Sequence, residues 1–262
     1  MNIETQRRTI PSAIKPKGNI PTWGVLPNLK IIKIGGQSIM DRGAEALMPL
    51  RDEIIEAAKK HPLLICAGGG TRARHAYGLG IDLKLPTGIM SELGAAVPRQ
   101  NARMLQMLLA RWGGIYIMPD DIEKLPLYLS MKSIPIIGGM PPFSYWEKPA
   151  IKGTIPEHRT DSGPFLLGEF FGTPEVYLVK DEDGLYDDNP KTNPKAQHIP
   201  EITAQELLSR NLPDLVLERV VVEHLCHARV CKRVRVFNGL KRGELMRALD
   251  GEAVGSVIKA EA

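Results

Sequence analysis

Short apolar runs that end in glycine, alternating with segments of helical period, constrain the fold of this chain most. LKIIKI ends at Gly35-Gly36, and LLICA (63–67) ends at Gly68-Gly69-Gly70. Further runs with the character of buried strands are IYIM, IPIIGG, VYLVK (176–180) and VRVFNG (234–239). The segments of helical period are 42–60, 71–80, 91–112, 161–172 and 244–251. Strands that alternate with helices predict an α/β fold, a three-layer α/β/α sandwich with a mostly parallel central sheet.

Composition excludes several classes of protein. Lys+Arg 34 and Asp+Glu 30 nearly balance, and aromatic residues make up only 5% of the 262 residues, so we expect no nucleic-acid partner. No apolar run approaches the roughly 18 residues of a membrane span, so we expect no membrane partner. The proline-rich residues 1–28, without a signal-peptide core, predict an N-terminal arm before a domain at 29–262. Three cysteines are too few for a disulfide framework, which favours a cytoplasmic protein.

The first candidate anion site is Lys33-Ile34-Gly35-Gly36, at the end of the first predicted strand. Two glycines allow the backbone to approach an anion closely, and Lys33 adds a positive charge, a combination that suits a nucleotide phosphate. A glycine turn after a strand is equally often only a turn. The chain lacks GxxxxGK[ST], which excludes a P-loop, and it lacks GxGxxG after a strand, which argues against a dinucleotide site.

A second candidate anion site follows the second predicted strand. Gly68-Gly69-Gly70 precedes a helix that carries Arg72 and Arg74, and helix N-termini and guanidinium groups both favour oxyanions. Because the carboxyl ends of parallel strands meet at one edge of a sheet, two such loops fit a phosphate donor and an anionic acceptor. The alternative for either arginine is a solvated helix face.

Two further motifs carry carboxylates. Asp161 opens a predicted helix, where it is either an N-cap or a group that holds lysines or a metal. The segment Lys180–Lys191 follows a strand and is rich in carboxylates, which suit Mg²⁺ bound through nucleotide phosphates, or else form an exposed acidic turn. A metal site at Cys226, His227 and Cys231 is less favoured than small buried cysteines in an apolar segment.

In this order, the four motifs resemble the amino acid kinase superfamily, and within it the bacterial uridylate kinases, from about Leu29 to Ile258. The resemblance implies a fold that binds ATP and Mg²⁺ and assembles as hexamers. It implies three catalytic residues: Lys33, Asp161 and Lys180. It implies ATP-binding residues at Lys33, Gly35, Gly36, Asp183, Gly184, Tyr186, Asp187, Pro190 and Lys191. The implied metal ligands are Asp161 and Glu182, and the implied oxyanion-binding residues are Gly68, Gly69, Gly70, Arg72 and Arg74.

Three departures from the uridylate kinase pattern modify that expectation. Asp181 stands where those kinases have a lysine, and Lys180 lies one residue earlier. An aspartate there reverses the charge next to the transferred group. Ser91 stands where they have the acid that contacts the ribose. A short loop is expanded to residues 140–163, which brings Lys148, His158 and Arg159 to the acceptor side as further oxyanion-binding candidates.

In these three departures the chain resembles the molybdenum storage proteins, which are two-subunit relatives of the uridylate kinases. It resembles their β-type subunit in particular. That resemblance implies an ATP-hydrolysing subunit of a cage that stores molybdate or tungstate as polyoxometalate clusters. The implied partner is a homologous α-type subunit in a heterohexamer, or further copies of this chain in a homohexamer. Two alternatives stay open, a nucleoside monophosphate kinase acting on a UMP-like substrate and a non-catalytic subunit of a kinase-like hexamer.

Overall fold

A mostly parallel sheet forms the centre of the molecule. The computed structural model describes residues 24–142 and 155–261, and within them eight strands pair in the order β3-β4-β2-β1-β5-β9-β10-β8. Their bounds are β1 Lys30–Ile34, β2 Leu63–Ala67, β3 Gly114–Tyr116, β4 Ile134–Gly138, β5 Glu175–Lys180, β8 Glu201–Thr203, β9 Arg233–Asn238 and β10 Ser256–Lys259. The β9–β10 pair is antiparallel, whereas the other pairs are parallel. The predicted sheet is confirmed.

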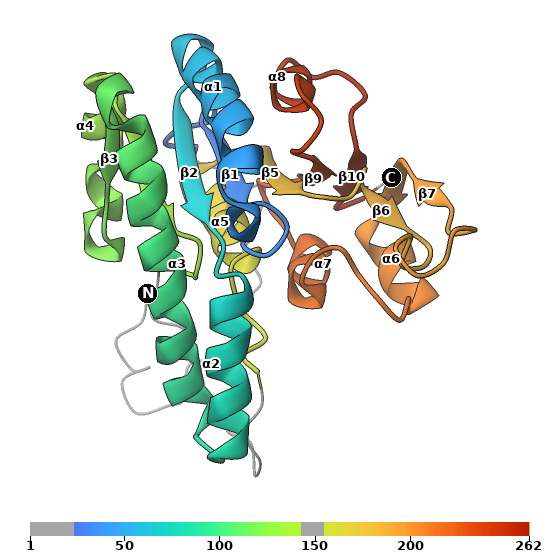
Figure 1. Cartoon of the computed structure of the whole chain (residues 1–262). Helices are drawn as coiled ribbons and strands as arrows, with labels where there is room; N and C mark the ends of the chain where they lie inside the picture. The colour runs from blue at the N-terminus through green and yellow to red at the C-terminus, as the bar shows by residue number, and fades with distance from the viewer. Residues whose placement is uncertain (1–23, 143–154, 262) are drawn as a thin grey trace, which may run out of the picture.

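Helices cover both faces of this sheet, because neighbouring residues of each buried strand face opposite sides. Ile31 packs into one apolar core, and Ile32 packs into the other. The core around Ile32 is closed by α1 (Ala44–Lys60), α3 (Thr87–Leu109) and α8 (Glu244–Leu249). The core around Ile31 is closed by α4 (Leu125–Ser130), α5 (Ser162–Phe171), α6 (Ala204–Arg210) and α7 (Arg219–Leu225). The result is the predicted three-layer sandwich (Figure 1).

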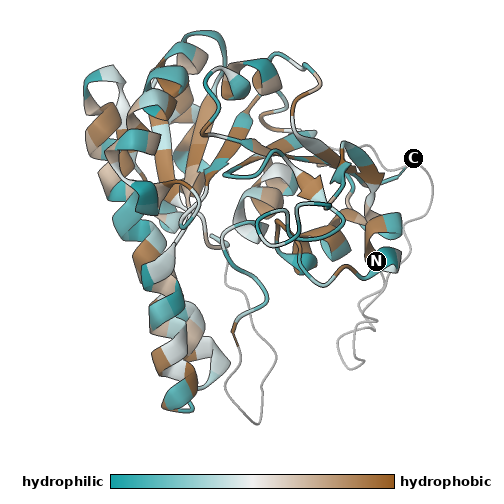
Figure 2. Cartoon of the chain, turned by 45° about the vertical axis from the view of Figure 1, so that its right-hand side comes forward, coloured by the Kyte–Doolittle hydropathy of each residue, from teal (hydrophilic) through white to brown (hydrophobic). Residues whose placement is uncertain are grey.

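Two helices extend beyond the sheet. α2 (Thr71–Asp82) packs along the first part of α3, and the pair projects from the body of the molecule (Figure 2). The helix predicted over 91–112 begins earlier, at Thr87, and its last residues form the 3-10 turn η3 (Ala110–Trp112). Among the helices of the described part of the chain, none combines the length and apolar character needed to cross a bilayer.

Short elements complete the edge of the sheet near the predicted motifs. A 3-10 turn, η2 (Met40–Arg42), follows β1, and another, η4 (Pro119–Lys124), follows β3. β6 (Leu185–Tyr186) pairs with β7 (His198–Ile199) as a separate antiparallel ribbon. Of the predicted arm, residues 1–23 lie outside the described residues. Leu26 donates its backbone N–H to the carbonyl of Phe171, so the end of that segment lies against α5.

Candidate functional site

A cleft of about 910 Å³ opens at the carboxyl edge of β1, β2 and β5. Four of the predicted motifs meet there. Its lining residues are Lys33 in β1 and Gly36 after it, Gly69, Gly70 and Arg74 after β2, Arg159 and Asp161 before α5, Lys180 at the end of β5, and Glu182, Gly184, Tyr186, Pro190 and Lys191 after β5, among others. The strand order explains the convergence, because β1 lies between β2 and β5 in the sheet.

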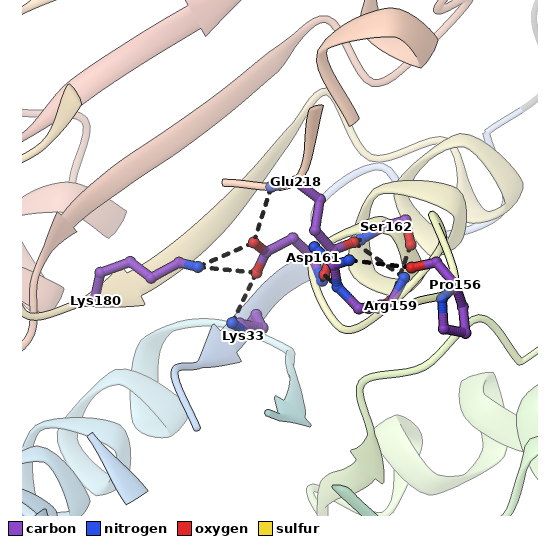
Figure 3. A network of polar contacts seen from close by, with 7 residues as sticks. All are labelled: Lys33, Pro156, Arg159, Asp161, Ser162, Lys180 and Glu218. Atoms are coloured by element: carbon purple, nitrogen blue, oxygen red, sulfur yellow. Dashed lines mark hydrogen bonds and ion pairs between the residues drawn. The ribbon is translucent and has the colours of Figure 1, made fainter. Parts of the chain in front are cut away.

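Asp161 lies at the centre of this cleft, between two lysines. Its Oδ1 lies 2.7 Å from the Nζ of Lys33, and its Oδ2 accepts a hydrogen bond of 2.9 Å from the Nζ of Lys180. The three residues come from β1, the loop before α5, and β5 (Figure 3). Lys33 and Asp161 are buried, which makes their mutual attraction strong. Within this group of three residues the two ammonium groups outnumber the one carboxylate, so the group itself carries one net positive charge.

The pKa values of this group follow from burial and charge. Burial alone would raise the pKa of Asp161, but the ammonium groups of Lys180 and Lys33 hold it well below its usual range, so the carboxylate is ionised. Burial lowers the pKa of Lys180 to about 8, against the opposing pull of Asp161. Lys180 is therefore mostly a cation at neutral pH. Such cations stabilise charge on a transferred phosphoryl group.

Glu218, which was not predicted as a site residue, fixes the loop that carries Asp161. Its carboxylate accepts hydrogen bonds from the backbone N–H groups of Arg159 (3.1 Å), Asp161 (3.0 Å) and Ser162 (3.0 Å). Its own N–H donates to Oδ2 of Asp161 at 3.3 Å. Burial and the charge of Asp161 raise the pKa of Glu218. In the sequence Glu218 is only an acidic residue directly before the segment RVVVEHL. Asp161, whose N–H it binds, lies 57 residues earlier in the chain.

The two glycine loops pack directly against each other. A Cβ at Gly36 would lie 2.0 Å from the backbone N of Gly70, and a Cβ at Gly68 would lie 2.5 Å from the N of Gly36. Only glycine fits either position without displacing backbone. Across this contact Asp41, from η2, accepts a hydrogen bond of 2.6 Å from the N–H of Thr71 at the start of α2. Asp41 was not predicted as a site residue, and its carboxylate lies at the start of α2, where an oxyanion was expected.

Only some of the predicted oxyanion-binding side chains line the cleft. Arg74 and Arg159 line the cleft, and Nη1 of Arg159 donates to the carbonyl of Pro156 at 3.1 Å. Arg72 instead donates to Gln100 (2.9 Å) and Asn101 on α3, and it is not among the residues that line the cleft.

His158 is buried, and its Nε2 lies 2.9 Å from the Nε2 of His224 on α7, away from the cleft lining. The last of the oxyanion-binding candidates, Lys148, falls in the segment outside the described residues.

The predicted nucleotide loop contributes unevenly to the cleft. Gly184, Tyr186, Pro190 and Lys191 line it. Asp183 turns to Asn238 (2.9 Å) and to Lys241 (2.7 Å), and its hydrogen bond from Lys241 lowers its pKa.

Asp187 accepts a hydrogen bond of 2.7 Å from the N–H of Gln197 and thereby closes the β6–β7 ribbon. Asp183 and Asp187 are therefore placed to shape the loop rather than to face the cleft. Gly35 lies behind Gly36, with its N–H bound to the carbonyl of Val179.

The carboxylates of the cleft could supply Mg²⁺ with only a few of its ligands. Both oxygens of Asp161 are occupied by lysines, Glu182 contacts Lys191 at 2.8 Å, and the described residues contain no group of three or more metal-binding side chains. An ion here would be held mainly by nucleotide phosphates, as Mg²⁺ commonly is, with Asp161 or Glu182 adding at most one or two oxygens. The Cys226–Cys231 segment follows the end of α7 at Leu225, and its cysteines are free.

Comparison with known proteins places the chain among kinase-like sequences. The model of the amino acid kinase family matches residues 28–222. The chain is 47% identical over 236 residues to the molybdenum storage protein subunit beta of Azotobacter vinelandii, covering 90% of this chain and 87% of that protein. It is 27% identical over 237 residues to the uridylate kinase of Methanothermobacter thermautotrophicus, covering 87% and 98%. The fold matches uridylate kinase from Archaeoglobus fulgidus with a TM-score of 0.66 at 22% identity, covering 87% and 99%.

Proposed function

This chain belongs to the amino acid kinase family, and from that premise we propose that it binds ATP in the cleft and couples ATP hydrolysis to the storage of molybdate or tungstate. The cargo would be held as polyoxometalate clusters inside a hexameric cage, built with a homologous α-type subunit or from copies of this chain. Residues 29–262 would be the nucleotide- and oxyanion-binding domain, preceded by an arm at 1–28.

The nucleotide part of the proposal rests on one observation. The carboxylate of Asp161 binds both Lys33 and Lys180 in the cleft that the two glycine loops line. In hydrolysis a water oxygen bonds to the γ-phosphorus and loses a proton to solvent, the bond from that phosphorus to the ADP oxygen breaks, and ADP and phosphate leave. The charge on the moving phosphoryl group is met by Lys33 and Lys180, which Asp161 keeps in place. Mg²⁺ bound to the phosphates would neutralise part of the remaining charge.

The cargo part of the proposal rests on the relative and on the acceptor side of the cleft. The chain is 47% identical to a protein named for molybdenum storage, whereas it is 27% identical to the uridylate kinase of Methanothermobacter thermautotrophicus. Molybdate is a tetrahedral oxyanion like phosphate, so Arg74 and Arg159, which line the cleft, supply cations for it.

A nucleoside monophosphate kinase is the second candidate, because the uridylate kinase of Methanothermobacter thermautotrophicus aligns over 87% of this chain. The family's ribose-contacting acid corresponds to Ser91, which is not among the cleft-lining residues. A serine cannot offer the charged acceptor that two ribose hydroxyls would favour. This favours storage over nucleoside phosphorylation. A non-catalytic subunit is the third possibility, and it predicts ATP binding without turnover.

Phosphate release separates these candidates. Purified chain, alone and mixed with an α-type subunit, is incubated with ATP and with molybdate, UMP or CMP in turn. The storage proposal predicts hydrolysis that molybdate stimulates and no UDP or CDP product. Brisk phosphorylation of UMP would contradict it, and ATP binding without hydrolysis in every mixture would identify a non-catalytic subunit. Asp161→Asn serves as the inactive control and Asp52→Asn, on the surface of α1, as the active one.

A further inference from the structure

Asp181 places a negative charge inside the cleft where ATP is proposed to bind. It follows Lys180 at the end of β5 and is among the cleft-lining residues. A carboxylate beside a polyphosphate repels it, so by sequence this position weakens the site. The structure gives the side chain a different environment, because two cations from other segments bind it.

Both cations bind the same carboxylate oxygen. Nη2 of Arg42 lies 2.7 Å from Oδ2 of Asp181, and Nζ of Lys191 lies 2.8 Å from it. Lys191 also contacts Oε1 of Glu182 at 2.8 Å. Burial alone would raise the pKa of Asp181, but the hydrogen bonds from Lys191 and Arg42 hold it below its usual range, so the carboxylate stays ionised and keeps both partners.

The cations lie on the outside of this cluster. The side chain of Asp181 is only 11% exposed, whereas those of Arg42 and Lys191 are 46% and 56% exposed. All three residues line the cleft. A ligand in the cleft therefore meets the guanidinium and the ammonium before it meets the carboxylate.

The cluster joins two sides of the cleft. Arg42 comes from η2, after the first glycine loop, and its Nε donates to the carbonyl of Ser38 at 2.8 Å, which fixes the direction of the guanidinium. Lys191 comes from the loop after β6. Neither segment is adjacent to the other in sequence, and Asp181 is the shared contact that brings their charges together.

We propose that Asp181 is a positioning residue that gathers Arg42 and Lys191 into a paired cation for the phosphates of ATP. The inference rests on the proposed function, since it takes the cleft to be an ATP site. It assigns the phosphate contact to Arg42 and Lys191, and it turns Asp181 from a repelling group into the group that holds them.

Calorimetric titration of the full chain with ATP in the presence of Mg²⁺ tests this assignment. Arg42→Ala and Lys191→Ala should each weaken ATP binding by about tenfold, the size of a charge-assisted contact. Asp181→Ala should also weaken binding severalfold, although it removes a negative charge from a phosphate site. In the Arg42→Ala/Lys191→Ala background the same change should instead tighten binding, because there the carboxylate only repels.

This reversal of sign distinguishes positioning from simple electrostatics. The matched controls are Asp52→Ala and Lys59→Ala on α1, which break the pairs with Arg51 and Glu56 outside the cleft lining and should leave ATP affinity unchanged. Tighter binding by Asp181→Ala in the otherwise unaltered chain would overturn the inference, as would unchanged affinity in Arg42→Ala and Lys191→Ala.

The outcome also separates this inference from the proposed function. A chain that shows the reversal but never accumulates molybdenum contradicts the storage proposal and supports the inference. If the chain accumulates molybdenum with ATP but its Asp181→Ala variant binds ATP more tightly, the storage proposal is supported and the inference is contradicted. Absence of ATP binding to the unaltered chain would contradict both.

Discussion

At the scale of single residues, the site depends on one buried carboxylate that holds two ammonium groups. Lys33 and Lys180 would repel each other without Asp161, because both side chains are largely withdrawn from water. The same arrangement serves stability and chemistry, since cations that are already in place need no rearrangement when phosphate arrives.

Removal of that carboxylate should therefore be costly. We expect Asp161→Asn to lower the free energy of unfolding by about 3 kcal/mol or more at pH 7, because it leaves buried ammonium groups unpaired. The folded-state pKa of Asp161 lies below its ordinary value of 3.8, so its contribution is complete above that value and is lost as the pH falls below it. Urea denaturation should show a gap between the two proteins that shrinks in acid. A full gap at pH 2 would contradict the assignment.

The charge of Lys180 should set the alkaline limit of activity. Since burial lowers its pKa to about 8, the ammonium is lost as the pH rises through that value, and kcat/KM for ATP should fall with it. Lys180→Arg, which stays protonated, should retain measurable activity and lose this falling limb. A profile that is identical in both proteins would show that another group titrates.

Residue types alone could identify part of this site. Lys33, Asp161 and the glycines were predictable because each lies at the end of a strand or the start of a helix, where a parallel sheet gathers its ligands. Glu218, Asp41 and Arg42 were not, because their roles depend on partners that lie 57, 30 and 139 residues away in the chain. No local pattern records such a pairing.

At the scale of elements, the contact between the two glycine loops fixes how close the loop after β1 lies to the loop after β2. Gly36→Ala would place a methyl group 2.0 Å from the backbone of Gly70. We expect the loops to separate and ATP affinity to fall at least tenfold, by calorimetry. Gly88→Ala on α3, where a Cβ would meet nothing within 4 Å, is the control and should bind normally. Equal affinity in both variants would show that the contact is dispensable.

The link between α7 and α5 gives a second test at this scale. Glu218→Gln replaces an acceptor of three backbone N–H groups by a side chain with one acceptor oxygen, so a buried donor is left facing a donor. We expect the free energy of unfolding to fall by about 1–3 kcal/mol and kcat for ATP hydrolysis to fall while KM changes little.

Glu223→Gln, on the exposed side of the same helix, is the matched control for this change and should alter neither quantity. If Glu218→Gln loses stability but retains the full kcat, Glu218 has no part in positioning Asp161.

The elements themselves were predictable where their pattern was long or strongly apolar. β1, β2, β5 and β9 match the predicted runs to within a residue, since each is buried on both faces. α3 begins earlier than predicted, because Thr87 and Gly88 give no apolar signal, and the helical segment predicted over 42–60 includes Arg42, which lies in the turn η2 instead. Short elements that form through tertiary contacts leave little trace in a sequence.

At the scale of the whole molecule, a kinase-like sheet presents Lys33, Asp161 and Lys180 and two glycine loops at one edge, and Arg74 and Arg159 line the same cleft. The fold follows from the alternation of strands and helices, and the family from the match over residues 28–222. The proposed storage of molybdate or tungstate requires the assembled cage, so it is tested on the assembly and not on the isolated chain.

The most direct measurement is elemental analysis of the native assembly, made from this chain alone and together with an α-type subunit, after incubation with molybdate in the presence and absence of ATP. The account predicts molybdenum in large molar excess over protein, dependent on ATP and lost in Asp161→Asn but not in Asp52→Asn. Trace metal in every sample, together with rapid conversion of UMP to UDP, would contradict it.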